Sequence, residues 1–198
     1  MLRASQLPLI QRAHTLAPPG LIGHVRSRTH APPSSSTALF PKIPVTLGVL
    51  SDIVLQHRPV VERLVQGLTG RGFIVEMVEI QANRIPATLV ACDLFAGRWY
   101  ADYPDADSFT NTLLHSQHGI YGPLCGDPKL DAIIERARAE TDPRVRRDDY
   151  AEIEEVLQRD AILLPLFHES AYCFAQADVR GFEVKFPYPG VSYEELWL

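Results

Sequence analysis

The sequence predicts a mixed α/β fold from three observations. Pro44–Leu50 and Phe73–Ile80 concentrate β-branched and apolar residues, as strands do. Pro59–Gly70, between them, repeats apolar residues every three or four positions, as one face of a helix does. Two later segments that begin with Asp-Pro repeat the same helical spacing. With 198 residues, 46% of them hydrophobic, the chain is long enough to bury a core.

Composition disfavours several classes of function. The formal net charge of -5 argues against a nucleic-acid-binding protein, because no basic patch is available to neutralise phosphates. No apolar run reaches the length that a membrane-spanning helix needs. The three cysteines, Cys92, Cys125 and Cys173, contain no C-x-x-C pair, so we expect neither a disulfide framework nor a zinc ribbon. Cys92 and Cys173 lie in apolar runs and are predicted core residues.

The N-terminal segment differs from the rest in composition. Met1–Thr37 is rich in Pro, Ser, His and Arg and has no sustained period, so we expect little fixed structure there. Ala31–Thr37 is typical of a flexible linker. The first apolar stretch is interrupted by Pro8 and Gln11 and does not match a secretory signal. We therefore predict a flexible segment over residues 1–40 and a folded domain over 41–198.

The elements of the first half follow in order. The strand–helix–strand arrangement predicts a parallel pair with a right-handed crossover, and Gly70 and Gly72 end the helix. Gln81–Thr88 is predicted as a short helix, although it contains Pro86. Leu89–Cys92 and Leu94–Ala96 are apolar and predict a buried strand. The helix is expected to bury Val61, Leu64, Val65 and Leu68.

The stretch that follows this strand, GRWYADYPDADSF at Gly97–Phe109, is the candidate site. Open α/β sheets bind ligands at the carboxyl ends of their strands, and aromatic side chains beside a carboxylate could hold an amine-bearing ligand. The alternative is a solvated acidic loop that starts a helix. Asp105 and Asp107 fit a helix start, whereas Asp102 precedes Pro104 and lies outside the helix.

The segment HSQHGIYGPLC at His115–Cys125 is a predicted loop that could carry specificity. His115 and His118 are three positions apart, and with Cys125 they could be metal ligands. No fourth ligand stands at a zinc-like spacing, and loop histidines are commonly solvated. We therefore expect no metal site and no cofactor.

The second half contains two helices and a strand-rich tail. Asp127–Pro128 and Asp142–Pro143 each combine an N-cap Asp with Pro at the first helical position. The run Arg144–Asp149 mixes charges and is expected to be a solvated face. The predicted buried residues are Leu130, Ile133, Ile134 and Ala137 in the first helix and Val145, Tyr150, Ile153, Val156 and Leu157 in the second. In the tail we predict an edge or kinked strand at Ala161–His168, strands at Ala171–Ala175 and Gly181–Phe186, and a short terminal element at Glu194–Leu198.

Catalytic motifs are missing from the sequence. It contains no G-x-S-x-G elbow, phosphate loop, H-E-x-x-H or Gly-rich dinucleotide turn. Asp102 could be paired with His168 or His115, but no serine or cysteine is placed specifically beside either pair. We therefore expect a protein that is not an enzyme.

Several motifs together carry a family resemblance. The candidate site resembles the pattern Trp-x-Ala-Asp-Tyr-x-x-Pro/Asp-x-x-Phe, and Gly126–Glu169 and Val179–Val184 follow in the corresponding order. In this respect the chain resembles the family 5 extracellular solute-binding proteins, the dipeptide, oligopeptide and nickel binding components of ABC importers. The resemblance covers roughly residues 40 to 198, and Ala17–His24 resembles the Pro-Pro-Gly segment that precedes the family's second lobe. The matching residues of the site are Trp99, Ala101, Asp102, Tyr103, Pro104, Asp105, Asp107 and Phe109.

The resemblance implies a fold, a function and a location. It implies a type II periplasmic-binding-protein-like α/β fold, with the second lobe and the C-terminal return strands present and the first lobe largely missing. It also implies a periplasmic or extracellular protein that captures peptides for an ABC permease and ATPase. Asp102 would pair with the α-ammonium group of the peptide and Trp99 would line the cleft. Tyr100, Tyr103, His118 and Tyr121 would contact ligand side chains.

An alternative function remains open at this point. A one-lobed site cannot close around its ligand, so the chain could be a truncated remnant or a sensory module that binds nothing tightly alone. The resemblance further implies that the tail crosses back to the first lobe, so some of its apolar surface should lack cover.

Overall fold

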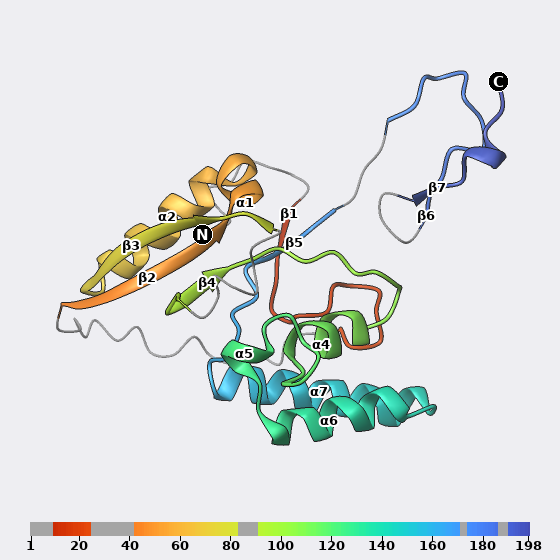
Figure 1. The fold of residues 1–198 in the computed structure, drawn as a ribbon. Coiled ribbons are helices and arrows are strands. Elements are labelled where there is room, and N and C mark those ends of the chain that lie inside the picture. The colour runs from red at the N-terminus through yellow and green to blue at the C-terminus, as the bar shows by residue number, and fades with distance from the viewer. Residues whose placement is uncertain (1–9, 25–41, 83–90, 171–173, 186–189) are drawn as a thin grey trace.

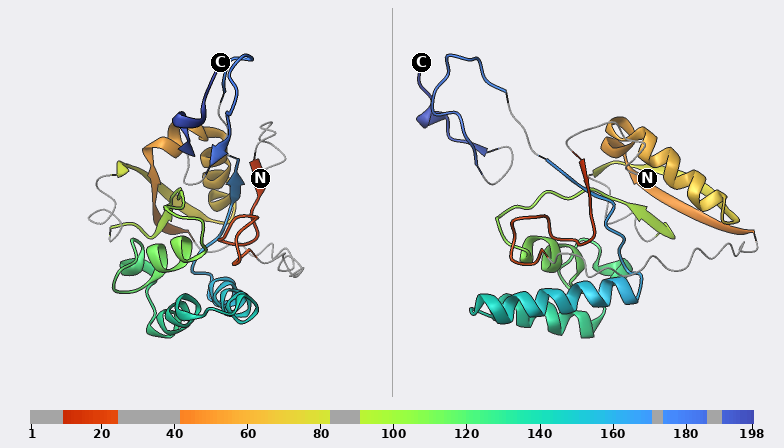
Figure 2. Two further views of the ribbon diagram at one scale, coloured as in Figure 1. Left: turned by 90° about the vertical axis from the view of Figure 1, so that its right-hand side faces the viewer. Right: turned by 180° about the vertical axis from the view of Figure 1, so that it is seen from behind.

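The computed structural model describes residues 10–24, 42–82, 91–170, 174–185 and 190–198. A parallel sheet with two helices along one face forms one part of the molecule, and a layer of helices forms a second part beside it (Figures 1 and 2). Ala31–Thr37 and most of Gln81–Thr88 and Ala171–Ala175, with Cys173, lie outside the described residues. The mixed α/β fold predicted from the sequence is confirmed.

The sheet has the predicted strand–helix–strand core. Strand β2 (Ile43–Leu50) lies between β3 (Phe73–Ile80) and β4 (Leu94–Ala96), and all three strands are parallel. Helices α1 (Ser51–Gln56) and α2 (Arg58–Thr69) connect β2 to β3. Helix α1 is a single short element that we did not predict, because six residues are too few for a clear periodic pattern.

The sheet and α2 enclose the first hydrophobic core. Val61 is buried, and the other three predicted residues of the α2 face pack against the same core as half-buried side chains. Strand β4 is shorter and more exposed than predicted, because it is an edge strand that pairs with β2 over three residues only. The buried members of this core are Leu47, Val49, Leu50, Ile53, Val61, Ile80 and Cys92.

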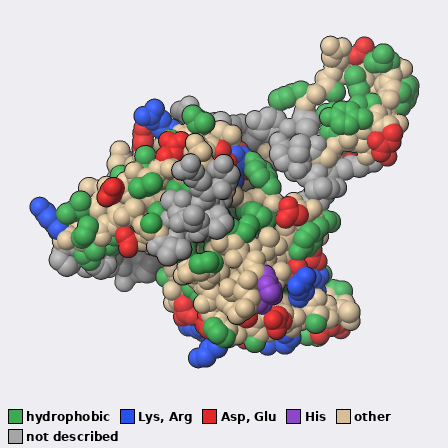
Figure 3. Space-filling model, viewed as in Figure 1, with side chains coloured by type: hydrophobic (Ala, Val, Ile, Leu, Met, Phe, Trp, Pro, Cys, Tyr) green, Lys and Arg blue, Asp and Glu red, His purple; other side chains and the backbone are tan. Residues whose placement is uncertain are grey.

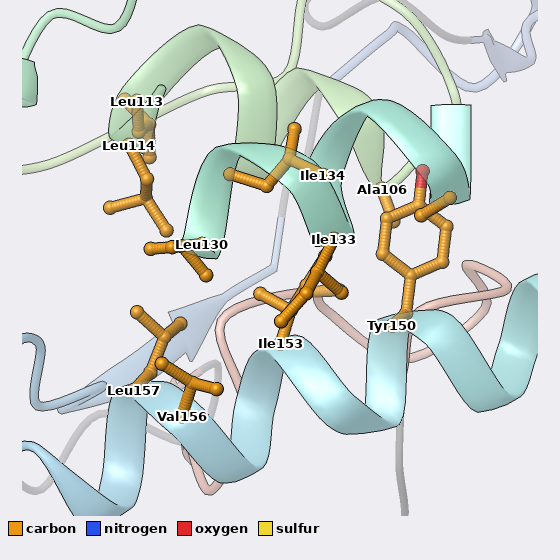
Figure 4. Packing of buried hydrophobic residues seen from close by; sticks show 12 residues of the cluster. Ala106, Leu113, Leu114, Leu130, Ile133, Ile134, Tyr150, Ile153, Val156 and Leu157 are labelled. Atoms are coloured by element: carbon orange, nitrogen blue, oxygen red, sulfur yellow. The ribbon is translucent and has the colours of Figure 1, made fainter. Parts of the chain in front are cut away.

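The helical layer contains α4 (Asp107–Leu114), α5 (Gly122–Cys125), α6 (Pro128–Ala139) and α7 (Pro143–Arg159). The two Asp-Pro helix starts are confirmed: the carboxylates of Asp127 and Asp142 accept the amides of Lys129 and Arg144 at 2.9 and 2.8 Å. Figure 4 shows how apolar side chains from α4, α6 and α7 point toward one another. All predicted core positions of α6 are buried, as are those of α7 except Val145.

Two expectations for the start of α7 are wrong. Val145 is 45% exposed, because it lies in the first turn, before the helix reaches the core. Arg144–Asp149 is not wholly solvated either. Asp149 is buried and binds Arg136 of α6 at 2.8 Å, and Arg146 is partly buried. The mixed charges of this segment therefore hold α7 against its neighbours.

The expectation of little fixed structure in the N-terminal segment is wrong for Ile10–His24. Strand β1 (Ile10–Arg12) pairs antiparallel with β5 (Phe167–Glu169), forming a ribbon of two strands. Ala17 is buried in the helical core, and the Leu16 amide donates to Glu154 of α7 at 2.6 Å. These contacts join residues more than a hundred positions apart, which local sequence patterns do not report.

The C-terminal residues form an arm that stands away from the rest (Figures 1 and 2). Strands β6 (Val184–Lys185) and β7 (Gly190–Val191) pair antiparallel, and a turn of 3-10 helix, η3 (Tyr193–Glu195), follows. The predicted strand at Gly181–Phe186 is thus reduced to two residues in its described part. Trp197 pairs with Arg180 as an isolated bridge.

Hydrophobic side chains lie on the surface of this arm (Figure 3). Phe174, Trp197 and Leu198 are 88%, 64% and 87% exposed. The expectation that apolar surface of the tail lacks cover therefore agrees with the structure of these residues.

Candidate functional site

The predicted site begins where β4 ends. Strand β4 runs parallel to β2, with Val49 opposite Ala96, so the segment that follows Ala96 leaves the carboxyl end of the sheet as predicted. Residues 97–106 then cross to the helical layer and enter α4 at Asp107. We call residues 97–103 the candidate loop. It joins the two cores, so its backbone is anchored at both ends.

Trp99 is fixed to the helical core rather than standing free in solvent. Its indole N–H donates to the carbonyl oxygen of Ser108 at 2.8 Å, and its ring packs against the core cluster. The side chain is half-buried, so one part of the ring remains at the surface. Trp99 therefore offers a rigid apolar wall.

Asp102 is exposed and lies three positions after Trp99 in the sequence. Its amide donates to the Ser108 hydroxyl at 3.0 Å, so Ser108 binds both Trp99 and Asp102. Its carboxylate makes no hydrogen bond or ion pair with any residue that the structure describes. Ser108 is fully buried, and the sequence analysis missed it. The available signal was a serine in the first turn of the predicted helix.

Asp105 has a structural role. Arg146 of α7 binds both of its carboxylate oxygens, at 2.7 and 2.9 Å, and Tyr150 donates to it at 3.2 Å. It also accepts the Asp107 amide at 2.8 Å, which supports the start of α4. Burial alone would raise the pKa of Asp105, but these hydrogen bonds and the charge of Arg146 lower it below its ordinary value. Helix capping was predicted, and the pair with Arg146 was not.

Asp107 is buried, and its carboxylate also has partners within the fold. It accepts the hydroxyl of Tyr103 at 2.6 Å and lies 3.5 Å from the guanidinium of Arg138. Burial and the hydrogen bond to Asp107 raise the pKa of Tyr103. Tyr103 is 38% exposed, so its ring is accessible while its hydroxyl is held. The distinction drawn from the sequence between Asp102 and the other two aspartates thus agrees with their contacts.

Tyr100 and Tyr121 both contact residues near the start of the candidate loop. Tyr100 is exposed, and the guanidinium of Arg98 stacks 4.7 Å from its ring centroid. The ring of Tyr121 packs 5.3 Å from that of Phe95, and burial raises the pKa of Tyr121 to about 12. A Cβ atom at Gly97 would lie 2.5 Å from the Phe95 ring and 2.6 Å from the Tyr121 hydroxyl oxygen, so a larger residue here would force these side chains to shift.

We had expected both histidines of the next segment, His115 and His118, to be solvated, but only His118 is exposed. His115 is buried, its Nδ1 accepts the Gln117 amide at 3.1 Å, and its Nε2 lies 3.2 Å from Glu135. His118 is exposed and stacks on His115 with ring centroids 4.5 Å apart. Among the described residues, His118 has no hydrogen bond or ion pair with the candidate loop, and no three side chains that could bind a metal ion lie together.

Comparisons with known proteins extend this description. No protein-family model matches the chain. The probable deoxycholate-binding periplasmic protein YgiS of Escherichia coli is 29% identical over 100 residues, which are 50% of this chain and 18% of YgiS. The periplasmic oligopeptide-binding protein OppA of Haemophilus influenzae is 26% identical over 106 residues, which are 54% of this chain and 19% of OppA. The resemblance to the family 5 solute-binding proteins is confirmed.

Solved structures show the same fold. HbpA2 from Haemophilus parasuis superposes with a TM-score of 0.74 at 15% identity, and the match covers 96% of this chain and 40% of HbpA2. The periplasmic binding protein DppA from Helicobacter pylori superposes with a TM-score of 0.66 at 18% identity, over 96% of this chain and 39% of DppA, so the chain shares the fold of a periplasmic binding protein. The chain matches about a fifth of the length of its curated relatives. No helix among the described residues is long and apolar enough to cross a membrane.

Proposed function

We propose that the chain binds peptide-type solutes with a free α-amino group, as part of the solute-binding component of an ABC importer in the periplasm or outside the cell. The observation that carries this proposal is the exposed carboxylate of Asp102, which has no partner among the described residues. The curated relative OppA, named as an oligopeptide-binding protein, supports the class of ligand.

The chemistry of the loop supports an ammonium ligand. A carboxylate and an ammonium group form a charge-assisted hydrogen bond, roughly twice as strong as a neutral one. Trp99 and the exposed ring of Tyr100 would supply apolar and cation–π contacts beside it. Tyr103, Tyr121 and His118 would contact the side chains of the ligand. Asp105 and Asp107 are occupied by Arg146 and Tyr103 and have no such role in the proposal.

The relative YgiS raises a different class of ligand, because its name describes probable deoxycholate binding. Deoxycholate is an anion without an amine, and the Asp102 carboxylate would repel an anion in the same position. The proposal therefore favours a peptide over a bile acid. It includes no chemical transformation of the ligand, so the protein acts as a binding protein and not as an enzyme.

Calorimetric titration with three probes tests the proposal: trialanine, N-acetyl-trialanine and deoxycholate. We expect wild-type protein to bind trialanine, and Asp102→Asn to weaken that affinity by about ten- to a hundredfold, the loss of one charged hydrogen bond. Asp160→Asn is the matched control, because Asp160 is an exposed aspartate at the end of α7. It should leave the affinity unchanged.

Three results would contradict the proposal. Equal affinity for trialanine and its acetylated form would show that no ammonium group is recognised. If deoxycholate binds with measurable heat and neither peptide does, the ligand is an amphipathic anion and not a peptide. If none of the three probes gives a heat of binding, the alternative is favoured, in which the chain is a remnant that binds nothing tightly alone.

A further inference from the structure

Arg98 lies directly before Trp99 and contacts two other elements, α1 and β5, as well as its own loop. Its guanidinium donates to the side-chain oxygen of Gln56 at 2.8 Å and also to the carboxylate of Glu169. It lies 3.6 Å from Asp52 of α1 and stacks on Tyr100 within the candidate loop. Its side chain is only 16% exposed. No pattern in the sequence had indicated a role for Arg98.

The partners of Arg98 belong to parts of the chain that are distant in sequence. Gln56 and Asp52 are in α1, which follows the carboxyl end of β2. Glu169 is in β5, 71 positions from Arg98, and forms part of the β1–β5 ribbon. Glu169 also lies 3.6 Å from the buried His57, which precedes α2. The sheet unit, the ribbon and the loop therefore meet at this one guanidinium.

We propose that Arg98 is a positioning residue that couples the β1–β5 ribbon to the candidate loop. A planar guanidinium can bind Gln56 and Glu169 at the same time in a fixed geometry, and the charge of Arg98 compensates two carboxylates. A shift of β5 relative to α1 would break one of these contacts and leave a partly buried charge without its partner. The loop backbone and Tyr100 would therefore follow the ribbon.

The predicted effects on affinity rest on the proposed function, in which the candidate loop is the ligand site. Arg98→Met and Glu169→Gln should each weaken trialanine binding about tenfold or more, because each removes the same partly buried charged contact. Their combination should cost no more than the larger single effect, since contacting residues are not additive. Arg98→Lys should recover only part of the affinity, because an ammonium group lacks the guanidinium fork.

Hydrogen exchange measured by mass spectrometry tests the coupling without a ligand. Both Arg98→Met and Glu169→Gln should speed exchange in residues 97–103 while leaving α6 and α7 unchanged. Arg159→Met is the control, because Arg159 forms an exposed pair with Asp160 on α7, away from the loop. It should not change exchange in the loop.

The outcomes separate this proposal from the proposed function. If wild-type protein binds no peptide, the proposed function fails, while faster loop exchange in both variants still supports the coupling. Unchanged loop exchange in Glu169→Gln overturns the coupling even where trialanine binds. Faster exchange spread evenly over all helices overturns it as well, because it would show general loss of stability. Strictly additive effects on affinity would also contradict a shared contact.

Discussion

Removing the carboxylate of Asp105 should destabilise the fold much more than removing an equivalent one at the surface. Asp105 and Arg146 are 29% and 17% exposed, so their bidentate pair is intermediate between an exposed pair, which is worth at most about 1 kcal/mol, and a buried one, whose disruption costs about 3–5 kcal/mol. Asp105→Ala also removes the acceptor for Tyr150 and for the Asp107 amide. We expect a total loss of about 3 kcal/mol in the free energy of unfolding.

Urea unfolding followed by circular dichroism measures this loss, with Asp160→Ala as the matched control. Asp160 forms a bidentate pair with Arg159 at 2.8 Å for both contacts, but that pair is exposed. The control should therefore unfold like the wild-type protein. The prediction depends on the burial of the Asp105–Arg146 pair. It is refuted if Asp105→Ala and Asp160→Ala lower the free energy of unfolding by the same small amount.

The dependence on pH gives a second measurement of the same pair. The pKa of Asp105 is lower in the folded protein than its ordinary value of 3.8, so its contribution is complete above that value and is lost as the pH falls further. The difference in stability between wild-type protein and Asp105→Ala should therefore shrink below about pH 4. A difference that stays constant down to pH 2 would contradict the assignment.

Three further predictions concern the loop and the N-terminal segment. Gly97→Ala should lower the melting temperature, because the added Cβ would lie 2.6 Å from the Tyr121 hydroxyl oxygen, and a thermal scan without any shift would refute the close approach. Burial raises the pKa of Glu154 from its ordinary value of 4.5 to about 7, so the contribution of Glu154 to stability should be complete below pH 4.5 and fall by about 3 kcal/mol as the pH rises to 7. Glu154→Gln should abolish that fall in urea unfolding at a series of pH values, and an unchanged profile would show that another group is responsible. Ser108→Ala should cost about 1 kcal/mol of stability and weaken trialanine binding, because the Asp102 amide loses its acceptor, whereas unaltered affinity would remove Ser108 from the site.

Local signals predicted much of the fold correctly. The two Asp-Pro starts of α6 and α7 were recognised because capping is decided within a few residues of chain. The limits of β3 were exact, because its apolar run is bounded by a glycine turn. The N-terminal segment was misjudged, since β1 and Ala17 are held by β5 and by the helical core rather than by any pattern of their own.

The candidate site was only partly visible in the sequence. Its position after a strand and the separate character of Asp102 followed from spacing and from Pro104. Arg98 was missed, because an isolated arginine carries no periodic or spacing signal. Ser108 was missed although its place in the first turn of the predicted helix was an available signal. His115 was expected in solvent, but its burial depends on contacts with α6, which lies further along the chain.

The sequence by itself determined the class of fold, the main helices and strands, and the stretch that carries the candidate site. These features depend on side-chain periodicity and capping, which act over a few neighbouring residues. Only the tertiary structure showed which side chains bind Asp105 and Asp107. Arg146 lies 41 positions from Asp105, and Arg138 reaches Asp107 from another helix, so their ion pairs exist only after the helical layer has packed. The same packing leaves Asp102 exposed, with its amide held by Ser108.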